Sequence, residues 1–503
     1  MKSVKKLICM LLLVGLIVPV LASCGNDAAS TTGNNGTADT GVGSTDGTAD
    51  TQDMSAVLEI PEDVTYDGYE FIFFTGSNVN TCPHIFTADE EDNAIDEAIY
   101  KRNLKIEEKY DITIKEEYQV KDSTAGAGAA YMKISQAYDA NDTLIDAAVA
   151  SAYDCGTLAI RGMLSDLRDY GYLNLDKTWW DQAANKQLTI YDRTYFTAGD
   201  ISYIDDNFTY AIVFNKEMAT SLQLEDMYAL VRDGKWTYEK LYEFSKKATV
   251  LDNTEGFGEN DVIGFLGYCD SIWMSFSSIG ATVASINSDG ALDLSLNTEK
   301  NFKMITEWTE FGMDESFLNW QLEQKKGNDA GSNWKNVYAN NQALFFGATV
   351  DGVYKLRNTE VNYGFLPWPK YDESQTEYCS GMAPNHISLF CIPAIGDDEH
   401  VERTSILVEA LANGSDIVMD GFYEKNLQGK SVRDDESYET LDIIFANKIF
   451  DLGYYYNVGA YRANMFTRFR DGQTTFASFY AEQEVAAKKS IKEINDLYKG
   501  LLD

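Results

Sequence analysis

Hydrophobic residues follow two different periods along the chain after about residue 60. Short apolar runs at 69–76 and 144–151 predict buried strands, and 111–120 alternates apolar and polar residues like a half-buried strand. Between the first two of these strands in the chain, Ile95, Ile99, Ile106 and Tyr110 recur near a period of 3.6, with Asp92 or Asn93 available as the cap, which predicts a helix. Strands that alternate with helices indicate an α/β layer architecture with parallel strands.

The second half of the chain repeats this alternation. Apolar runs at 343–350, 361–369 and 385–393 predict further strands, and 401–413 and 438–451 predict helices. The chain closes with a long predicted helix that Gly500 ends, and its shared apolar face consists of Phe476, Tyr480, Ala487, Ile491, Ile494 and Tyr498.

The first residues have the layout of an export signal. Lysines at 2, 5 and 6 precede an uncharged, mostly aliphatic run from 7 to 22, which Pro19 interrupts and which is shorter than the roughly 20 residues of a membrane-spanning helix. The sequence "LASC" resembles the lipobox of bacterial lipoproteins, which implies that residues 1–23 are removed and that Cys24 is lipidated. The alternative is an ordinary signal peptide cut nearby, with Cys24 unmodified.

A polar segment follows the signal. Residues 24–58 are mainly Gly, Ser, Thr, Asn, Asp and Ala, and "GTADT" occurs twice. Such a composition has little to bury. We expect a disordered acidic linker between the membrane and the folded domain.

Composition limits the partners. The chain carries 79 acidic and 41 basic residues, a formal net charge of −38. Such a charge repels nucleic acid and anionic headgroups and suits a neutral or cationic small partner. With three histidines and no "HExxH", "GxSxG" or complete calcium-loop pattern, we expect no metal and no cofactor. Among the scattered cysteines, only Cys379 with Cys391 is considered as a disulfide pair.

Four segments together resemble family 1 extracellular solute-binding proteins, the maltose-binding-like receptors of ABC importers. They lie at 93–114, 200–249, 362–381 and 429–457; the second, with "FNKEM" followed by "GKWTYEKLYEFSKKAT", is the most telling. The resemblance implies an α/β fold of two hinged lobes with mostly parallel sheets, the type II periplasmic-binding-protein fold, and a ligand cleft between the lobes. By analogy, the chain crosses between lobes near 205–215, 363–370 and 421. Lobe one would be 60–210 plus 370–420, and lobe two 211–369 plus 421–503.

The same resemblance implies a function. The protein would be a lipoprotein, anchored by its lipid to the outer face of the bacterial cytoplasmic membrane. It would capture a neutral solute, above all a sugar, and deliver it to the permease subunits of an ABC importer without changing it chemically. A secreted glycoside hydrolase is an alternative, because a retaining enzyme needs only two carboxylates about 5 Å apart. A carbohydrate-binding surface protein unconnected to transport is another, and peptides also remain open as solutes.

Sugar binding requires aromatic planes and fixed oxygen atoms near the crossings. Ser77 and Asn78 follow the first strand, although they could merely form a turn. Trp179 and Trp180 are either ligand contacts or core packing. A polar cluster before the first crossing could bind hydroxyls, or could cap or stabilise the hinge; it consists of Tyr203, Asp205, Asp206 and Asn207.

Three further candidates come from later segments. Trp273 stands where the resembled receptors carry a cleft aromatic residue. Asp351 follows the strand that ends at the cleft in that family, where the family's usual aromatic residue is absent here. Tyr455 lies near the third crossing, in a run of tyrosines that could equally be packed. Trp368 is expected to brace the hinge.

Overall fold

The structure is a computed structural model that describes residues 57–78, 85–89, 93–252, 256–326, 334–356, 358–423 and 434–500. The chain divides into two units, residues 1–52 and 53–503, and all described residues belong to the second. Cys24, the signal segment and most of the linker therefore lie outside the described residues, and their assignments stay predictions.

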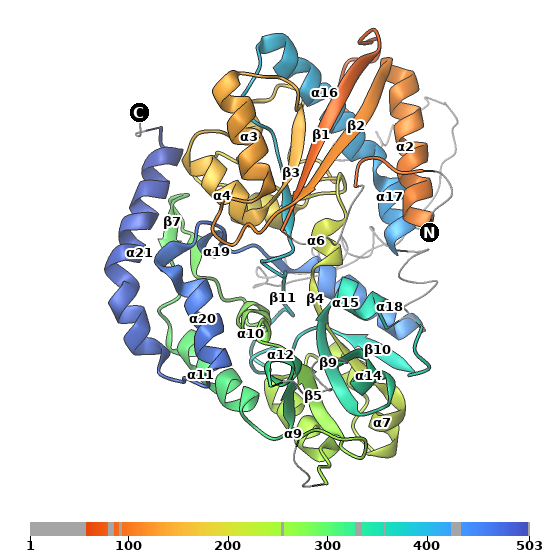
Figure 1. Ribbon diagram of the computed structural model, residues 1–503, viewed down its shortest axis with the longest axis vertical. Helices are drawn as coiled ribbons and strands as arrows, with labels where there is room; N and C mark the ends of the chain where they lie inside the picture. The colour runs from red at the N-terminus through yellow and green to blue at the C-terminus, as the bar shows by residue number, and fades with distance from the viewer. Residues whose placement is uncertain are drawn as a thin grey trace, which may run out of the picture. The chain divides into compact units, whose positions relative to one another are not determined.

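The first sheet has four strands in the order β12-β3-β1-β2 (Figure 1). Their bounds are β1 Tyr69–Ser77, β2 Ile112–Val120, β3 Ala147–Ser151 and β12 Ser388–Cys391. β1 pairs in parallel with β2 and β3, while β12 joins β3 in the antiparallel direction. The predicted strands are present, and every residue of β3 is buried, as its unbroken apolar run indicated.

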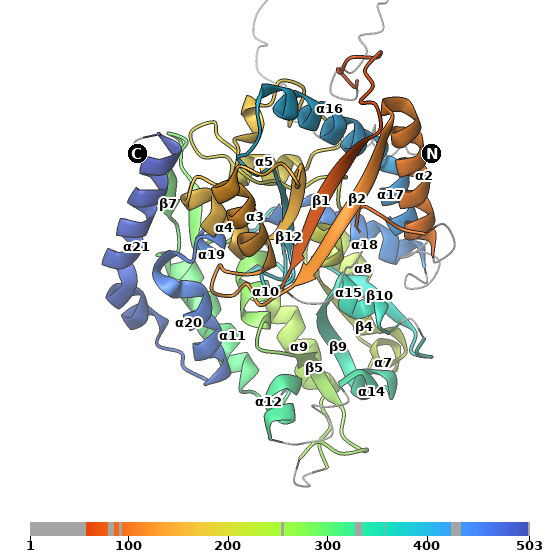
Figure 2. The same ribbon diagram turned by 45° about the horizontal axis from the view of Figure 1, so that its top comes forward.

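Helices cover this sheet. They are α2 Ala94–Tyr110, α3 Ala129–Ala140, α4 Ala152–Ile160, α16 Asp398–Gly414 and α17 Asp416–Asp420. Asn93 caps α2, as predicted, because its side-chain oxygen accepts the amides of Ile95 and Asp96. α16 and α17, from the second half of the chain, pack against α2 (Figure 2).

The second sheet has five strands in the order β10-β4-β9-β5-β8. Their bounds are β4 Tyr210–Asn215, β5 Ile263–Gly267, β8 Phe317–Asn319, β9 Ala343–Thr349 and β10 Tyr363–Leu366. β5 pairs in parallel with β8 and β9, but β4 and β10 are antiparallel members. The pattern of apolar runs revealed the strands and not their directions, so the expectation of parallel strands holds only for part of each sheet.

An aromatic core lies beside the second sheet. The rings of Trp308 and Phe265 have centroids 5.6 Å apart, and Trp368 lies 5.4 Å from Trp308 and 5.9 Å from Phe265. Trp368, expected at the hinge, is fully buried in this core.

The remaining elements complete the unit. Two short pairs, β6 Ala284–Ile286 with β7 Leu292–Leu294 and β11 Ser380–Gly381 with β13 Lys448–Ile449, stand apart from the two sheets. The other helices are η2 Leu167–Asp169, α5 Gln182–Leu188, α6 Ile204–Asn207, α7 Lys216–Ser221, α8 Met227–Arg232, α9 Tyr238–Ala248, α10 Ser271–Ser278, α11 Glu299–Gly312, α12 Trp320–Lys325, α14 Trp334–Ala339, α15 Val350–Tyr354, α18 Asp435–Ala446, α19 Leu452–Tyr455, η4 Val458–Ala460, α20 Tyr461–Arg470 and α21 Phe476–Tyr498.

The predicted terminal helix is α21, and its predicted apolar face is buried. The predicted helix at 438–451 is shorter than expected at its end, because Lys448 and Ile449 leave it to pair with β11. Among the described residues, no helix has the length and hydrophobicity needed to cross a membrane.

The pairing of Cys379 with Cys391 is wrong, since both are free thiols. Cys391 is buried in β12 of the first sheet, next to Cys155, whereas Cys379 lies in the loop before β11. The two cysteines are close in sequence but lie in separate parts of the fold.

Candidate functional site

Strand ends of both sheets carry polar side chains. In the first sheet, Asn78 follows β1 and Tyr153 follows β3; in the second, Asp270 follows β5 and Asp351 follows β9. The antiparallel strand β4 begins at this edge of the second sheet, because its first residue, Tyr210, pairs with Thr349 at the end of β9. Such edges are where α/β folds place ligands.

The edge of the first sheet is held by a complete set of hydrogen bonds. The Asn78 amide nitrogen donates to the Asn385 carbonyl at 2.8 Å, and its oxygen accepts the Ser123 amide at 2.7 Å. Tyr153 donates its hydroxyl to the Asn385 side-chain oxygen at 3.0 Å. Ser77, the last residue of β1, is buried beside them. Ser77 and Asn78 thus lie at the predicted edge, and Asn78 fixes the loops around it.

Asp270 is the distinctive group of the second edge. Its partly buried carboxylate forms no hydrogen bond or ion pair with any described residue, and burial raises its pKa to about 7. Burial first, and the charge of Asp270 in addition, raise the pKa values of Tyr153, Tyr210 and Tyr268, so these three residues lie near enough to Asp270 to interact with it electrostatically. We name Tyr153, Tyr210, Tyr268 and Tyr454 the tyrosine cluster.

Several buried polar atoms also have no hydrogen-bond partner among the described residues. The hydroxyls of Tyr210 and Tyr454 are unpaired in side chains that are 1% and 4% exposed. His386 Nδ1 and Trp320 Nε1 are unpaired as well. Burial lowers the pKa of His386 to about 4, so this imidazole is neutral at pH 7. Because buried polar groups are normally satisfied, these unpaired atoms are candidates for hydrogen bonds to a polar guest.

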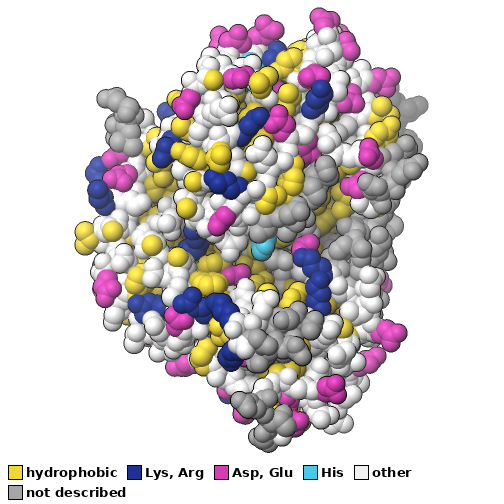
Figure 3. All heavy atoms as spheres, in the orientation of Figure 1, with side chains coloured by type: hydrophobic (Ala, Val, Ile, Leu, Met, Phe, Trp, Pro, Cys, Tyr) yellow, Lys and Arg dark blue, Asp and Glu magenta, His cyan; other side chains and the backbone are white. Residues whose placement is uncertain are grey.

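Aromatic surface accompanies these polar atoms. The rings of Tyr268 and Trp320 have centroids 5.7 Å apart, and Trp320 stacks on Trp334 at 5.8 Å. Figure 3 shows a hollow across this face of the molecule, with a histidine and hydrophobic side chains in its wall. Apolar planes beside hydrogen-bonding groups are what the C–H faces and hydroxyls of a sugar require.

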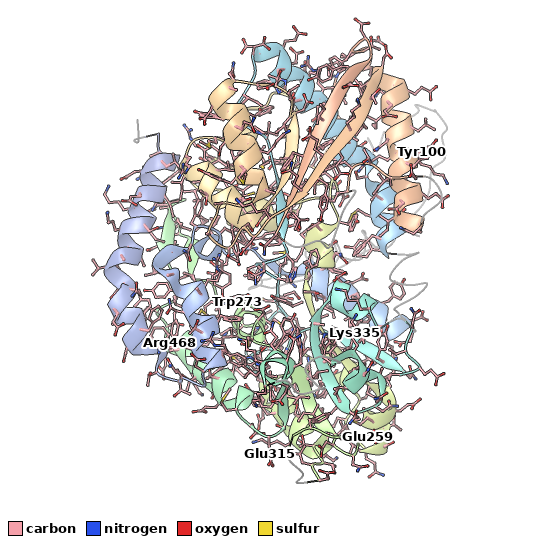
Figure 4. The ribbon with its side chains drawn as sticks, viewed as in Figure 1. Tyr100, Glu259, Trp273, Glu315, Lys335 and Arg468 are labelled. Atoms are coloured by element: carbon pink, nitrogen blue, oxygen red, sulfur yellow. The ribbon has the colours of Figure 1, made fainter. Side chains whose placement is uncertain are left out.

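Trp273 lies on α10, three residues after Asp270 (Figure 4). It is 4% exposed, and its indole N–H donates to the Arg462 carbonyl at 3.2 Å. The Arg462 guanidinium lies 3.6 Å from the ring centre of Tyr153 and donates to the carbonyls of Tyr454 and Thr124, at 3.0 and 3.1 Å. Trp273 therefore contacts the backbone of Arg462, and the guanidinium group of Arg462 links α20 to the loop after β2.

Asp205 and Asp206 lie in a buried ion network. The Lys448 ammonium contacts both carboxylates, the latter at 2.7 Å, and also Asp181 at 2.7 Å. Tyr423 donates its hydroxyl to Asp206. This network fixes α6 to β13, which favours the hinge-stabilising alternative for both aspartates.

The other two members of that predicted cluster flank the network. The Tyr203 ring stacks on Phe422 at 5.4 Å, and Asn207 is the partly exposed last residue of α6. Neither residue lies among the unpaired groups around Asp270.

Trp179 and Trp180 lie in the core. Their indole N–H groups donate to the two oxygens of Glu409 at 3.1 and 3.0 Å, and burial raises the pKa of that carboxyl to about 7. Both indoles are at most 4% exposed. The geometry favours the packing alternative for this pair.

Tyr455 is 5% exposed and packs its ring 6.4 Å from that of Phe196. Its backbone lies so close to α4 that a Cβ on Gly156 would come within 2.4 Å of the Tyr455 carbonyl oxygen. Asp351, by contrast, lies at the strand edge as predicted, where it pairs with Lys355 at 2.6 Å.

Two cavities bear on the choice of site. One, of about 720 Å³, lies beside Phe257, Ile263 and Phe317, at the opposite ends of β5 and β8 from Asp270. A small one of about 60 Å³ lies beside Tyr153 and Arg462, which is room for a water or two. The described part of the chain holds no group of three or more His, Cys, Asp or Glu side chains arranged to bind a metal ion.

Sequence reasoning missed Asp270, Tyr210, Tyr153, Asn385 and Trp320. Asp270 and Tyr153 could have been found, since each stands within three residues after a predicted or apolar strand. Tyr210 and Asn385 could not, because they lie at the beginnings of antiparallel strands whose direction the pattern does not reveal.

Comparison with solved structures shows which known proteins share this fold. An ABC substrate-binding protein from Listeria monocytogenes in complex with cycloalternan is 12% identical and covers 86% of this chain and 99% of its own, with a TM-score of 0.51. A cyclo/maltodextrin-binding protein complexed with maltotetraose is 13% identical over 86% of this chain and 96% of its own, with a TM-score of 0.53. The maltose-binding periplasmic protein of Listeria monocytogenes in complex with maltose is 13% identical over 87% and 100%, with a TM-score of 0.50.

No protein-family model matches the sequence, and no curated protein matches it. At these identities the likeness shows the fold. The chain has the α/β fold of ABC solute-binding proteins, as the sequence resemblance implied.

Proposed function

We propose that this protein is a family 1 solute-binding protein that captures a carbohydrate between its two sheets for an ABC importer. The observation that carries the proposal is a set of unpaired polar groups beside the strand edges: the Asp270 carboxylate after β5, and the buried hydroxyls of Tyr210 in β4 and of Tyr454 in α19. Sugar hydroxyls both donate and accept, so one guest can satisfy all of these groups.

Binding would act through domain closure. In our proposal the first sheet is the core of lobe one, 60–210 plus 370–420, and the second sheet is the core of lobe two, 211–369 plus 421–503. A solute that contacts both edges favours the closed form by its differential affinity for that form. The closed form would then dock on permease subunits.

The lipid anchor belongs to the same proposal. Lipidation of Cys24 would hold the protein at the outer face of the cytoplasmic membrane, and the linker up to residue 58 would keep the folded unit near its permease. Tethering raises the effective concentration of the receptor at its partner without any new contact.

An enzymatic role finds less support in the site. Among the described residues, no second carboxylate perturbs the pKa of Asp270, whereas a glycosidase needs two acids that act together. Prolonged incubation with the bound saccharide should therefore return it uncleaved.

The binding test is calorimetry of the full chain against a panel of oligosaccharides. We expect at least one to bind, and Tyr210→Phe, which removes only a hydroxyl, to weaken it about three- to tenfold, the usual value of one neutral hydrogen bond. The matched control is Tyr110→Phe, since Tyr110 also has a buried, unpaired hydroxyl but lies in α2. A panel without any ligand would contradict the function, and equal effects of the two variants would contradict the site.

A further inference from the structure

Asp270, which is partly buried, differs from the buried carboxylates of the described chain. Each of the others whose pKa burial raises accepts at least one hydrogen bond from the protein; they are Asp146, Asp154, Asp166, Asp205, Glu409 and Asp451. Asp270 accepts none. Because an unpaired buried carboxylate is costly, its donor is expected to come from outside the protein.

Asp270 also lacks a partner at a position where aspartate commonly has one. It stands at the N-cap of α10, where an aspartate usually accepts an amide of the first turn, yet its side chain makes no cap hydrogen bond. Asp226 and Asp434, at the same position of α8 and α18, both cap their helices. The Asp270 carboxylate thus accepts no amide from the first turn of α10, and it is available to a bound solute.

The charges around Asp270 do not neutralise it. Burial alone accounts for its raised pKa, so no cation of the described residues lies close enough to lower it. Three ionisable groups on neighbouring elements have other contacts or carry no charge. Asp351 pairs with Lys355, Arg462 lies over the face of Tyr153, and His386 is neutral at pH 7.

We propose that the captured saccharide carries a protonated amine, as an amino sugar does, and that Asp270 is the residue that selects it. This inference rests on the proposed function of the same site. A neutral hydroxyl would give Asp270 a single donor and leave its negative charge uncompensated. An ammonium group supplies three donors and cancels the charge, so in a partly buried site it is the better partner.

The tyrosine cluster fits the same guest. Tyr153, Tyr210 and Tyr268 lie near enough to Asp270 to interact with it electrostatically, and phenol rings and hydroxyl oxygens are both suitable partners for an ammonium group. The acidic chain, with a net charge of −38, also attracts a cationic solute.

The test compares three trisaccharides of equal length by calorimetry on the full chain: one of glucosamine, one of N-acetylglucosamine and one of glucose. We expect the glucosamine trisaccharide to bind at least tenfold more tightly than the other two. Asp270→Asn should remove this preference, because it keeps the shape of the side chain without its charge. Glu259→Gln is the charge-matched control, since Glu259 is exposed and lies well away from Trp273 in Figure 4.

The outcomes separate the two proposals. If a neutral trisaccharide binds as tightly as the glucosamine one, the amine is not recognised and only the general function stands. A preference for glucosamine that survives Asp270→Asn overturns the role of Asp270. If none of the three binds, the inference is contradicted, and the oligosaccharide panel decides whether the carbohydrate function stands.

Discussion

Replacing Asp270 by Asn should stabilise the protein without ligand, and more so as the pH rises. Burial raises the pKa of Asp270 from 3.8 to about 7, a shift of roughly three units at about 1.4 kcal/mol each. Its partial exposure reduces the effect, so we expect about 2 to 4 kcal/mol at pH 8. A raised folded-state pKa means that the charged form opposes folding. The contribution of Asp270 to stability is therefore fully present below about pH 4 and is lost as the pH rises to about 7.

Urea unfolding of the wild-type protein and of Asp270→Asn, at pH 5 and at pH 8, measures this effect. The stability advantage of the variant should be larger at pH 8 by about 1 to 2 kcal/mol, which is the part of the titration between those two values. Glu259→Gln should show no such dependence, because Glu259 is exposed. An equal advantage at both pH values, or a less stable variant at pH 8, would refute the argument that Asp270 is an unpaired buried charge.

Three other perturbations follow from the structure. Lys448→Met should cost about 3 to 5 kcal/mol in urea unfolding at pH 7, because it leaves the carboxylates of the buried ion network without their cation; a loss below about 1 kcal/mol would contradict that role. Trp273→Ala should weaken saccharide binding at least tenfold, since it removes the support of Arg462 beside Tyr153, and unchanged affinity in calorimetry would separate Trp273 from the site. Cys24→Ser should release the protein into the medium, whereas retention in the membrane fraction would argue against lipidation.

Periodicity was sufficient to predict several elements of the fold. β1, β2, α2 and α21 all form where their apolar residues recur at the period of a strand or a helix, because those residues face a core. Strand direction could not be predicted in the same way, since an apolar run reads the same in either direction. The antiparallel β4 and β12 therefore hid the contributions of Tyr210 and Asn385 to the edges.

The candidate site was predicted only in part, because the hydrogen-bond and ion-pair partners of several candidates lie far away in the sequence. Asp205 and Asp206 looked available for hydroxyls, but Lys448, more than two hundred residues away in sequence, occupies them. Trp179 and Trp180 were candidates for stacking on a ligand, but both indole N–H groups donate to Glu409. Local sequence indicates which groups can bind, whereas tertiary structure decides which of them remain unpaired.

The central claim is that a saccharide lies between the facing strand edges of the two sheets. A crystal structure of the protein with its bound solute tests this claim most directly. We predict density for the solute within hydrogen-bonding distance of the Asp270 carboxylate and of the Tyr210 hydroxyl. Density in the large cavity beside Phe257 and Phe317 instead, with Asp270 still unpaired, would contradict it.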